Sequence, residues 1–203
     1  MKAIVLIGGG GHCRACIDVI EQEGVYRIVG ILDALKADDE SILGYPILGR
    51  DDELKSFASN KWAALVTVGH IKNVTRRVEL YQIASELHMI TPPIISNKAY
   101  VSRHSFIGAG TIIMHGAVIN AAATVGDNCI LNTQSLIEHD VRIGSHCHIS
   151  TGARLNGGVT IGDQCFIGSG VTVKEGVNIG HNSLIGAGLT VLKDVNPGTI
   201  FAG

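Results

Sequence analysis

The second half of the chain places an aliphatic residue at every sixth position, without a break, from Val101 to Val191. An α-helix repeats every 3.6 residues and an ordinary strand every two, whereas a parallel β-helix of hexapeptide units repeats every six. The pattern therefore predicts a solenoid in which each unit forms one flat side of a coil. The repeated positions are Val101, Ile107, Ile113, Ile119, Val125, Leu131, Ile137, Ile143, Ile149, Leu155, Ile161, Ile167, Val173, Ile179, Ile185 and Val191.

The other positions of the repeat agree with a solenoid. The second position is often glycine, which suits a corner where the backbone has unusual dihedral angles or crowded neighbours. The fifth position is small or branched throughout, as expected for a second inward-facing site. Sixteen units at three per coil predict about five coils, stacked roughly 4.8 Å apart in a rod on the order of 25 Å long. The second-position glycines are Gly108, Gly126, Gly144, Gly162, Gly168, Gly180 and Gly186.

Residues 1–95 show alternating strand and helix patterns instead. This βαβ order predicts a Rossmann-like α/β domain at residues 1–95, followed by a β-helix domain at residues 96–203. The predicted elements are a strand at Lys2–Ile7, a helix from about Gly11 to Gln22, a strand at Tyr26–Leu32, a strand at Ala63–Val68 and an amphipathic helix at Lys72–Leu87.

Two short segments define how these domains begin and join. The apolar stretch Lys2–Ile7 continues into four glycines rather than a cleavage site, so we interpret it as a buried strand and not as a signal peptide. The pair Pro92-Pro93 predicts a stiff junction into the coils.

The glycine loop Gly8-Gly9-Gly10-Gly11-His12 lies between the first predicted strand and the first helix. A helix N-terminus in this position favours a phosphate or pyrophosphate through its backbone N–H groups and its dipole. Neither reading frame of the loop supplies the last glycine of G-x-G-x-x-G, which argues against NAD. Asp33 follows the second strand, where a carboxylate can bond a ribose or sugar hydroxyl. We expect the loops Tyr45–Gly49 and Thr67–Gly69 to close over such a ligand.

Three of the five cysteines, Cys129, Cys147 and Cys165, are spaced by 18 residues, which is one full coil. They should therefore stack inside the rod. Parallel side chains in register are poorly oriented for a disulfide, so we predict a reduced ladder in the core. Cys13 and Cys16 form a CxxC without a second pair at zinc spacing, and we interpret them as part of a helix face.

His139 is the candidate general base of the chain. It occupies the third position of its repeat, outside the prism, and Ala121 and Gly157 flank it one coil away on either side. These small neighbours leave space around the imidazole. A neutral histidine can take a proton from an attacking amine or hydroxyl, and an adjacent carboxylate fixes its tautomer and raises its basicity. Asp140 is the preferred partner and Glu138 the second choice.

The whole chain resembles the hexapeptide-repeat nucleotide-sugar acetyltransferases of the sialic-acid O-acetyltransferase and bacillosamine N-acetyltransferase type. The resemblance is carried by the glycine loop, by Asp33, by Asn132-Thr133 followed by Glu138-His139-Asp140, and by the long hexapeptide rod. It implies a left-handed β-helix, a homotrimer with active sites between neighbouring rods, and transfer from acetyl-CoA without a required metal.

The resemblance also implies a role for individual residues. His139 would be the general base, Asp140 the acid that tunes it, and Asn132 a neighbour of the acceptor. The residues expected to hold acetyl-CoA are His148, Gly157, Ser169 and Ala187. The residues expected to hold the nucleotide sugar are Gly10, Gly11, His12, Asp33 and Gly49. A UDP-linked amino sugar is favoured as the acceptor, with GDP- and dTDP-sugars as alternatives. Nothing in the residues separates N-acetylation from O-acetylation, and acylation of a sialic acid is the alternative reaction.

Composition limits the classes of partner. A formal net charge of −2 with dispersed Lys and Arg gives no electrostatic reason to expect nucleic acid. No apolar run approaches the ~18 residues that would cross a bilayer, so we expect a cytoplasmic protein without membrane insertion. Outward-facing Met114, Leu136 and Phe166 would be exposed on an isolated rod, which also favours a trimer.

Three other classes of protein are less compatible with the sequence. A β-helical carbonic anhydrase would hold zinc with histidines, but the spacing of 24 between His115 and His139 fits poorly, and the α/β domain has no purpose in that reaction. A nucleotidyltransferase would need a longer catalytic domain. A non-catalytic scaffold that binds nucleotide sugars remains as the alternative outside the enzymes.

Overall fold

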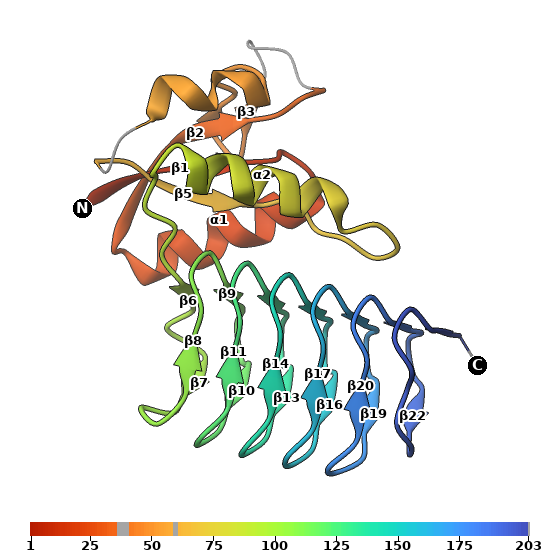
Figure 1. Ribbon diagram of the computed structural model, residues 1–203. Coiled ribbons are helices and arrows are strands. Elements are labelled where there is room, and N and C mark those ends of the chain that lie inside the picture. Colours follow the sequence, from red (N-terminus) through yellow and green to blue (C-terminus); the bar gives the residue numbers. More distant parts are fainter. Residues whose placement is uncertain (36–40, 59–60, 203) are drawn as a thin grey trace.

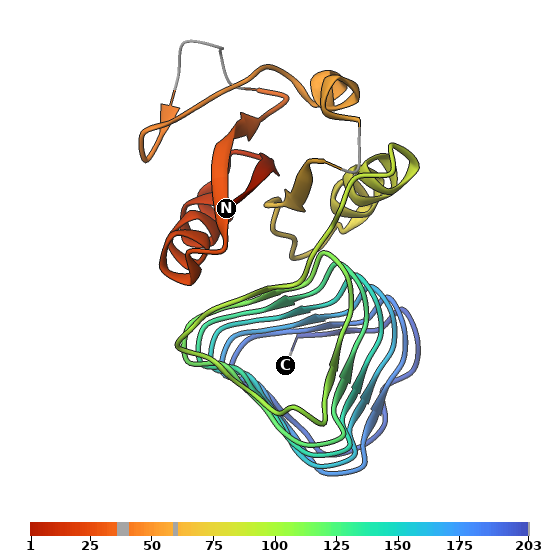
Figure 2. The ribbon, with the colours of Figure 1, turned by 90° about the vertical axis from the view of Figure 1, so that its left-hand side faces the viewer.

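The computed structural model describes residues 1–35, 41–58 and 61–202 as an α/β part that rests on one side of a three-sided rod (Figure 1). Residues 2–86 contain every helix of the described segments, and the rod is formed from residue 94 onward. The cross-section of the rod is a triangle, and the α/β part covers one of its three sides (Figure 2). This arrangement agrees with the α/β fold and solenoid predicted from the sequence.

The α/β part is built on a three-stranded parallel sheet in the order β2-β1-β5. Its faces follow the alternation of side chains along β1. Ile4 and Leu6 pack with α1, while Val5 and Ile7 pack with α2 and the short 3-10 helix η1. The elements are β1 (Lys2–Ile7), α1 (Gly11–Glu23), β2 (Tyr26–Leu32), β3 (Ser41–Ile42), β4 (Tyr45–Pro46), η1 (Asp51–Phe57), β5 (Ala63–Val66) and α2 (Thr75–Glu86).

The predicted helix near residue 11 and the first two strands are confirmed, but two boundaries move inward. The strand predicted to end at Val68 ends at Val66. Thr67 follows it and is tied to β1 and the glycine loop, because its N–H donates to the Ile7 carbonyl at 2.8 Å and its hydroxyl to the Gly8 carbonyl at 2.6 Å. The helix predicted from Lys72 begins at Thr75, where the Asn73 side chain accepts the Thr75 N–H at 2.8 Å. The β3–β4 hairpin and η1 were not predicted, since they are too short to show a period.

The rod consists of three parallel sheets, one on each side of the triangle. It has about six coils, close to the predicted five, because pairing starts before Val101 and continues after Val191. The six-stranded side contains β7 (Tyr100–Val101), β10 (Val118–Ile119), β13 (Leu136–Ile137), β16 (Arg154–Leu155), β19 (Thr172–Val173) and β22 (Thr190–Val191). The five-stranded side contains β8 (Phe106–Ile107), β11 (Thr124–Val125), β14 (Arg142–Ile143), β17 (Thr160–Ile161) and β20 (Asn178–Ile179). The seven-stranded side contains β6 (Ile94–Ile95), β9 (Ile112–Ile113), β12 (Ile130–Leu131), β15 (His148–Ile149), β18 (Phe166–Ile167), β21 (Leu184–Ile185) and β23 (Ile200–Phe201).

Each two-residue strand pairs with the strand one coil away, as Ile119 does with Ile137. The repeated aliphatic residues therefore stack in columns inside the rod, and with the fifth-position residues they form one continuous buried core. Burial of these columns stabilises a rod whose strands are too short to be stable alone.

Two reasons for glycine at the second position were expected, crowded neighbours and unusual dihedral angles, and the structure supports only the first. Second-position glycines are needed for space: a Cβ on Gly126 would lie 2.7 Å from the backbone of Gly144. The left-handed backbone conformation belongs instead to the fourth position, where Asp140 has φ of 60° and Gly158 has φ of 70°.

The cysteine predictions are confirmed, since all five thiols are free and buried. Within the rod each thiol donates to a glycine carbonyl of the next coil, as Cys147 does to Gly162 at 3.1 Å. Cys13 and Cys16 lie on the buried face of α1.

Helix α1 covers the seven-stranded side of the rod. Ile17 and Ile20 pack in one cluster with Ile112, Ile130 and other outward-facing residues of that side. The expectation that Met114 and Phe166 would be exposed is therefore wrong, because the α/β part of the same chain leaves them 2 % and 9 % exposed. Leu136, on the six-stranded side, is half-buried. The packing of these side chains thus gives little support to a trimer.

Candidate functional site

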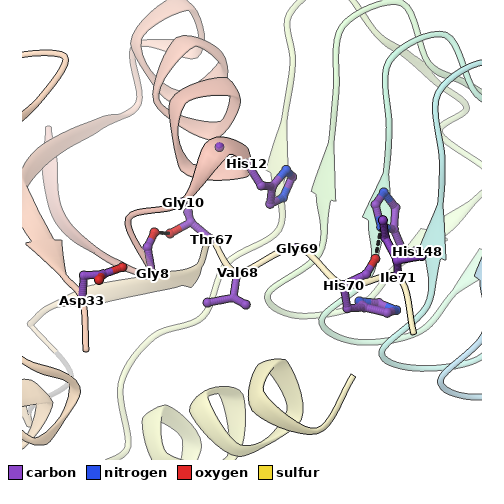
Figure 3. A pocket seen from close by; sticks show the side chains of 11 residues that line it. Gly8, Gly10, His12, Asp33, Thr67, Val68, Gly69, His70, Ile71 and His148 are labelled. Atoms are coloured by element: carbon purple, nitrogen blue, oxygen red, sulfur yellow. Dashed lines mark hydrogen bonds between the residues drawn. The ribbon is translucent and has the colours of Figure 1, made fainter. Parts of the chain in front are cut away.

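A cavity of about 510 Å³ lies between the α/β part and the rod (Figure 3). It opens where β1 and β5 end, because parallel strands present their carboxyl ends and following loops at one edge of a sheet. The lining residues are Gly8, Gly10, Gly11, His12, Asp33, Thr67, Val68, Gly69, His70, Ile71 and His148. The predicted loop Thr67–Gly69 thus forms a wall of the cavity.

Asp33, at the end of β2, fixes the glycine loop through hydrogen bonds to its carboxylate. Its Oδ2 accepts the Gly9 N–H at 2.5 Å and its Oδ1 accepts the Leu35 N–H at 2.9 Å. Gly8 donates its N–H to the Leu32 carbonyl at 2.8 Å, which ties the loop to the same strand end. The loop therefore precedes α1 in a fixed shape, with the helix beginning at Gly11.

Gly49 lies behind this site and does not line the cavity. Its carbonyl accepts the Asp33 N–H at 3.0 Å, so Gly49 is joined to the cavity through Asp33. The rest of the loop Tyr45–Gly49 is likewise absent from the cavity wall, because Leu48 packs with the hydrophobic cluster under α2.

Three histidines gather where the cavity meets the rod. The ring centroid of His148 lies 6.5 Å from that of His12 and 5.5 Å from that of His70. Burial lowers the pKa of His12 and of His70 to about 3 and that of His148 to about 4. All three rings are therefore neutral near pH 7 and can act as hydrogen-bonding groups without bringing charge.

The contacts of His148 select its tautomer. Its Nδ1 lies 2.8 Å from the carbonyl oxygen of His70, which can only accept, so Nδ1 carries the proton. Its Nε2 then accepts from the side-chain amide of Asn132 at 3.3 Å. Asn132 and His148, expected near two different ligands, thus lie side by side on the seven-stranded side of the rod.

His12 is held from within its own helix. The thiol of Cys16, one turn later in α1 and fully buried, lies 3.4 Å from its Nε2. Burial raises the pKa of Cys16 well above the ordinary value of a thiol, so Cys16 is the donor and His12 the acceptor. The Nδ1 of His12 therefore carries the ring proton.

Arg77 is a wholly buried side chain beside this cluster that the sequence analysis did not identify. Its guanidinium donates to the carbonyls of Val66 and Val68 at 2.8 Å each, and to the carbonyl of Asn128 in the rod at 3.0 Å. It thus fixes both ends of the loop that bears Thr67. The sequence does contain a sign of its burial, since Arg77 lies on the same helix face as the buried residues Leu80 and Ala84 in α2. His70, one residue beyond the predicted loop, was also missed.

His139 forms the predicted pair with Asp140. Its Nδ1 lies 2.8 Å from Asp140 Oδ2, and this hydrogen bond raises the pKa of the imidazole. Glu138 does not bond the imidazole, because its Oε2 accepts from the Asn120 amide at 3.0 Å and from the His139 backbone N–H at 3.3 Å. A Cβ on Gly157 would lie 2.7 Å from the ring, so the expected space beside His139 is filled by the imidazole itself.

The candidate residues do not meet at one place within the chain. His139 and Gly157 lie at the corner between the six-stranded and five-stranded sides. This corner is opposite the side that carries the α/β part (Figure 2). The cavity lies on that covered side, where His148 lines it. Ser169 and Ala187 occupy a third place, the corner between the seven-stranded and six-stranded sides, where the Ser169 hydroxyl lies 2.9 Å from that of Ser150.

Two further properties concern metals and membranes. Among the described residues there is no group of three or more His, Cys, Asp or Glu side chains arranged to hold a metal ion. No helix in the same part of the chain is long and apolar enough to cross a membrane.

Models of known protein families match both parts of the chain. Residues 3–82 match the PglD N-terminal domain. Residues 122–157 match the bacterial transferase hexapeptide, and residues 158–193 match the hexapeptide repeat of succinyl-transferase. None of the curated proteins compared with the chain matches it.

Solved structures match over nearly the full length. A mutant perosamine N-acetyltransferase from Caulobacter crescentus, in complex with CoA and GDP-perosamine, is 31% identical with a TM-score of 0.90, covering 97% of this chain and 91% of its own. The acetyltransferase domain of PglB from Neisseria gonorrhoeae is 30% identical with a TM-score of 0.93, covering 100% and 97%. The same domain in complex with acetyl coenzyme A has a TM-score of 0.91 at 30% identity, covering 100% and 96%.

Proposed function

Because the chain belongs to the hexapeptide-repeat nucleotide-sugar acetyltransferases, we propose that it transfers an acetyl group from acetyl-CoA to an amine of a nucleotide-linked sugar. The observation that carries this proposal is the cavity between the glycine loop and the rod. It combines groups suited to a diphosphate with neutral hydrogen-bonding side chains suited to a sugar. The Caulobacter relative holds both CoA and GDP-perosamine, which supports the same pair of substrates here.

The nucleotide sugar would bind along the cavity. Its diphosphate is assigned to the N-terminus of α1, where Gly10, Gly11 and His12 supply N–H groups and the positive end of the helix dipole. Its sugar would extend toward His148 on the rod. Asp33 would orient the ligand mainly by holding the loop, since both of its oxygens already accept backbone N–H groups.

We assign the proton transfer to His139 of a second protomer. The corner that bears His139 is opposite the cavity of its own chain, so a sugar bound in that cavity cannot reach it. A homotrimer with sites between neighbouring rods would bring the His139 corner of one chain to the cavity of the next. This geometry supports the trimer better than the surface residues Met114 and Phe166 do.

The reaction would be a direct transfer. The sugar amine attacks the thioester carbonyl, a C–N bond forms, and His139 accepts the amine proton. The C–S bond then breaks, and the CoA thiolate leaves and recovers that proton. Gly157, next to His139, would supply a backbone N–H to the oxyanion. No acyl-enzyme is expected, because all five thiols are buried.

Ser169 and Ala187 are assigned to the pantetheine or nucleotide part of acetyl-CoA. Both are small residues at one corner of the rod, stacked one coil apart, so they leave an open strip along the rod axis. The hydroxyl of Ser169 is engaged with Ser150, and contacts from this strip would therefore run largely through backbone groups. His148 would contribute where this strip approaches the cavity.

CoA release tests the proposal directly. The assay combines acetyl-CoA with UDP-, GDP-, dTDP- and CDP-linked amino sugars and with free sialic acid. We expect one amino sugar nucleotide to support turnover, with loss of at least ~10²-fold in kcat for His139→Ala. His181→Ala is the matched control, because His181 is exposed at the same position of its repeat. Turnover of the sialic acid alone would replace N-acetylation by O-acetylation. Nucleotide-sugar binding without any turnover would indicate the non-catalytic scaffold.

A further inference from the structure

A second cavity of about 290 Å³ continues the first along the edge of the sheet. The two cavities share Gly8, Asp33 and Val68, so together they form one groove across the ends of β2, β1 and β5. One half of the groove faces the rod, and the other half lies away from it under α2 and η1. The residues found only in the far half are Ala34, Leu35, Asp51, Arg76 and Leu80.

The proposed function sets the direction of a ligand in this groove. The acceptor sugar must lie in the half that faces the rod, because only that half contains a residue of the rod, His148. The glycine loop, assigned to the diphosphate, borders the shared middle. With the sugar and the diphosphate placed in this way, the nucleoside base must bind in the far half of the groove.

The far half has walls suited to a flat heteroaromatic base. Val68 and the exposed Leu35 provide aliphatic surface, with the buried Leu80 behind them, and Asp51 and Arg76 provide the polar edge. The Asp51 side chain is only 13% exposed, and its Oδ2 accepts from the Arg76 guanidinium. Arg76 also donates to Glu79 at 3.3 Å, which holds the guanidinium from its other side. The carboxylate is thus fixed in place, with a guanidinium beside it.

From this pairing of a carboxylate with a guanidinium we infer that the protein selects a guanosine diphosphate sugar, with Asp51 and Arg76 reading the base. Guanine presents two adjacent N–H donors, N1 and the exocyclic N2, which a carboxylate can accept as a pair. The same edge presents the O6 acceptor, which a guanidinium can contact. No other common base offers two donors and an acceptor in this order.

Other bases match the pair less well. Uracil and thymine have a single N–H flanked by two carbonyl oxygens, so a carboxylate gains one hydrogen bond and faces at least one repulsive oxygen. Cytosine and adenine each place a ring acceptor next to the amino group, where guanine has its N1–H. This inference differs from the UDP-sugar favoured by resemblance, and it rests on the proposed function only for the orientation of the ligand.

Binding of free nucleoside diphosphates to the full-length protein tests the inference without activity. Calorimetric titrations would compare GDP, UDP, CDP, dTDP and ADP on wild type, Asp51→Asn, Arg76→Gln and Asp52→Asn. Asp52 is the matched control, because it is exposed, adjacent in η1 and outside the groove. We expect GDP to bind at least ~10-fold tighter than UDP, and Asp51→Asn to weaken GDP about tenfold while changing UDP less than ~3-fold.

The outcomes separate the two proposals. Equal binding of all five diphosphates, or an equal loss for GDP and UDP in Asp51→Asn, would overturn the assignment of the base and leave the nucleotide-sugar function intact. Failure of every diphosphate to bind to wild-type protein that is shown to be folded by a cooperative melting transition would overturn both the assignment of the base and the proposed function. An effect of Asp52→Asn as large as that of Asp51→Asn would show that charge alone matters and would also contradict the inference.

Discussion

Arg77 and Asn128 bond each other in both directions across the junction between the α/β part and the rod. The Arg77 Nε donates to the Asn128 carbonyl at 3.0 Å, and the Asn128 side-chain amide donates to the Arg77 carbonyl at 3.3 Å. Both residues are fully buried. Because Arg77 also fixes Val66 and Val68, this pair connects the rod to the loop that lines the cavity.

Arg77→Met should therefore destabilise the protein and loosen the cavity. Its removal leaves three carbonyls without their guanidinium donor, two of them in buried hydrogen bonds and the third in a part-buried one. We expect a loss of about 2–4 kcal/mol in the free energy of unfolding. Urea denaturation measures this loss, with exposed Arg27→Met as the control at less than ~0.5 kcal/mol. A change in Arg77→Met no larger than in the control would contradict this account of the junction.

The buried histidines predict a loss of stability in mild acid. His12, His70 and His148 have folded pKa values of about 3, 3 and 4, below the ordinary 6.5. Below pH 6.5 the unfolded chain takes up protons that the native rings cannot hold, so stability falls as pH falls toward those values. Each ring contributes about 1 kcal/mol per pH unit in this window.

Denaturation between pH 7.5 and 5 measures this effect. His70→Phe keeps a ring packed against His148 and Phe166 and removes one titrating group, so it should reduce the pH dependence. Stability that stays constant from pH 7.5 to 5 in the wild type would mean that these rings are protonated in the native state.

The pair His139–Asp140 predicts the pH dependence of catalysis. A general base must be neutral, so kcat should fall as pH drops through the pKa of His139, which its hydrogen bond to Asp140 raises. Asp140→Asn removes this effect and should shift the acid limb to lower pH, while the plateau rate falls about tenfold because the tautomer is less well fixed. Rate profiles of both proteins measure the shift. An unchanged acid limb would assign the titrating group to another residue.

Gly157→Ala should disturb catalysis more than stability. The added Cβ would lie 2.7 Å from the His139 ring, which is exposed and can swing away at little cost. We expect a fall in kcat of about tenfold or more with a melting temperature near that of wild type, since a displaced base loses its alignment. Wild-type turnover in this variant would show that the ring position does not matter to the reaction.

Subunit mixing tests the site between protomers. Asp33→Ala damages the cavity and His139→Ala removes the proposed base, so each variant alone should be inactive. In every mixed trimer one of the three sites combines an intact cavity with an intact neighbouring His139, so activity should return to about a third of the wild-type value. Differently tagged chains allow the mixed species to be purified. Mixed trimers without activity would mean that cavity and base act within one chain.

The features that could be predicted from the sequence are those that depend on local repetition. A period of six with three units per coil gives a coil of 18 residues, which places Cys129, Cys147 and Cys165 in one column and Gly157 beside His139. The pairing of His139 with Asp140 follows from their adjacency. Two-residue elements such as β3 and β4 were missed because they have no period.

The sequence by itself thus determined the solenoid, the α/β part and the order of residues around each coil, since these follow from side-chain spacing along one chain. Only the tertiary structure decided that the α/β part covers the seven-stranded side, which buries Met114 and Phe166 and brings Arg77 to Asn128. The same docking separates the cavity from His139. Contacts of this kind depend on the shape complementarity of two surfaces that lie far apart in the sequence, and the spacing of residues along the chain does not show it.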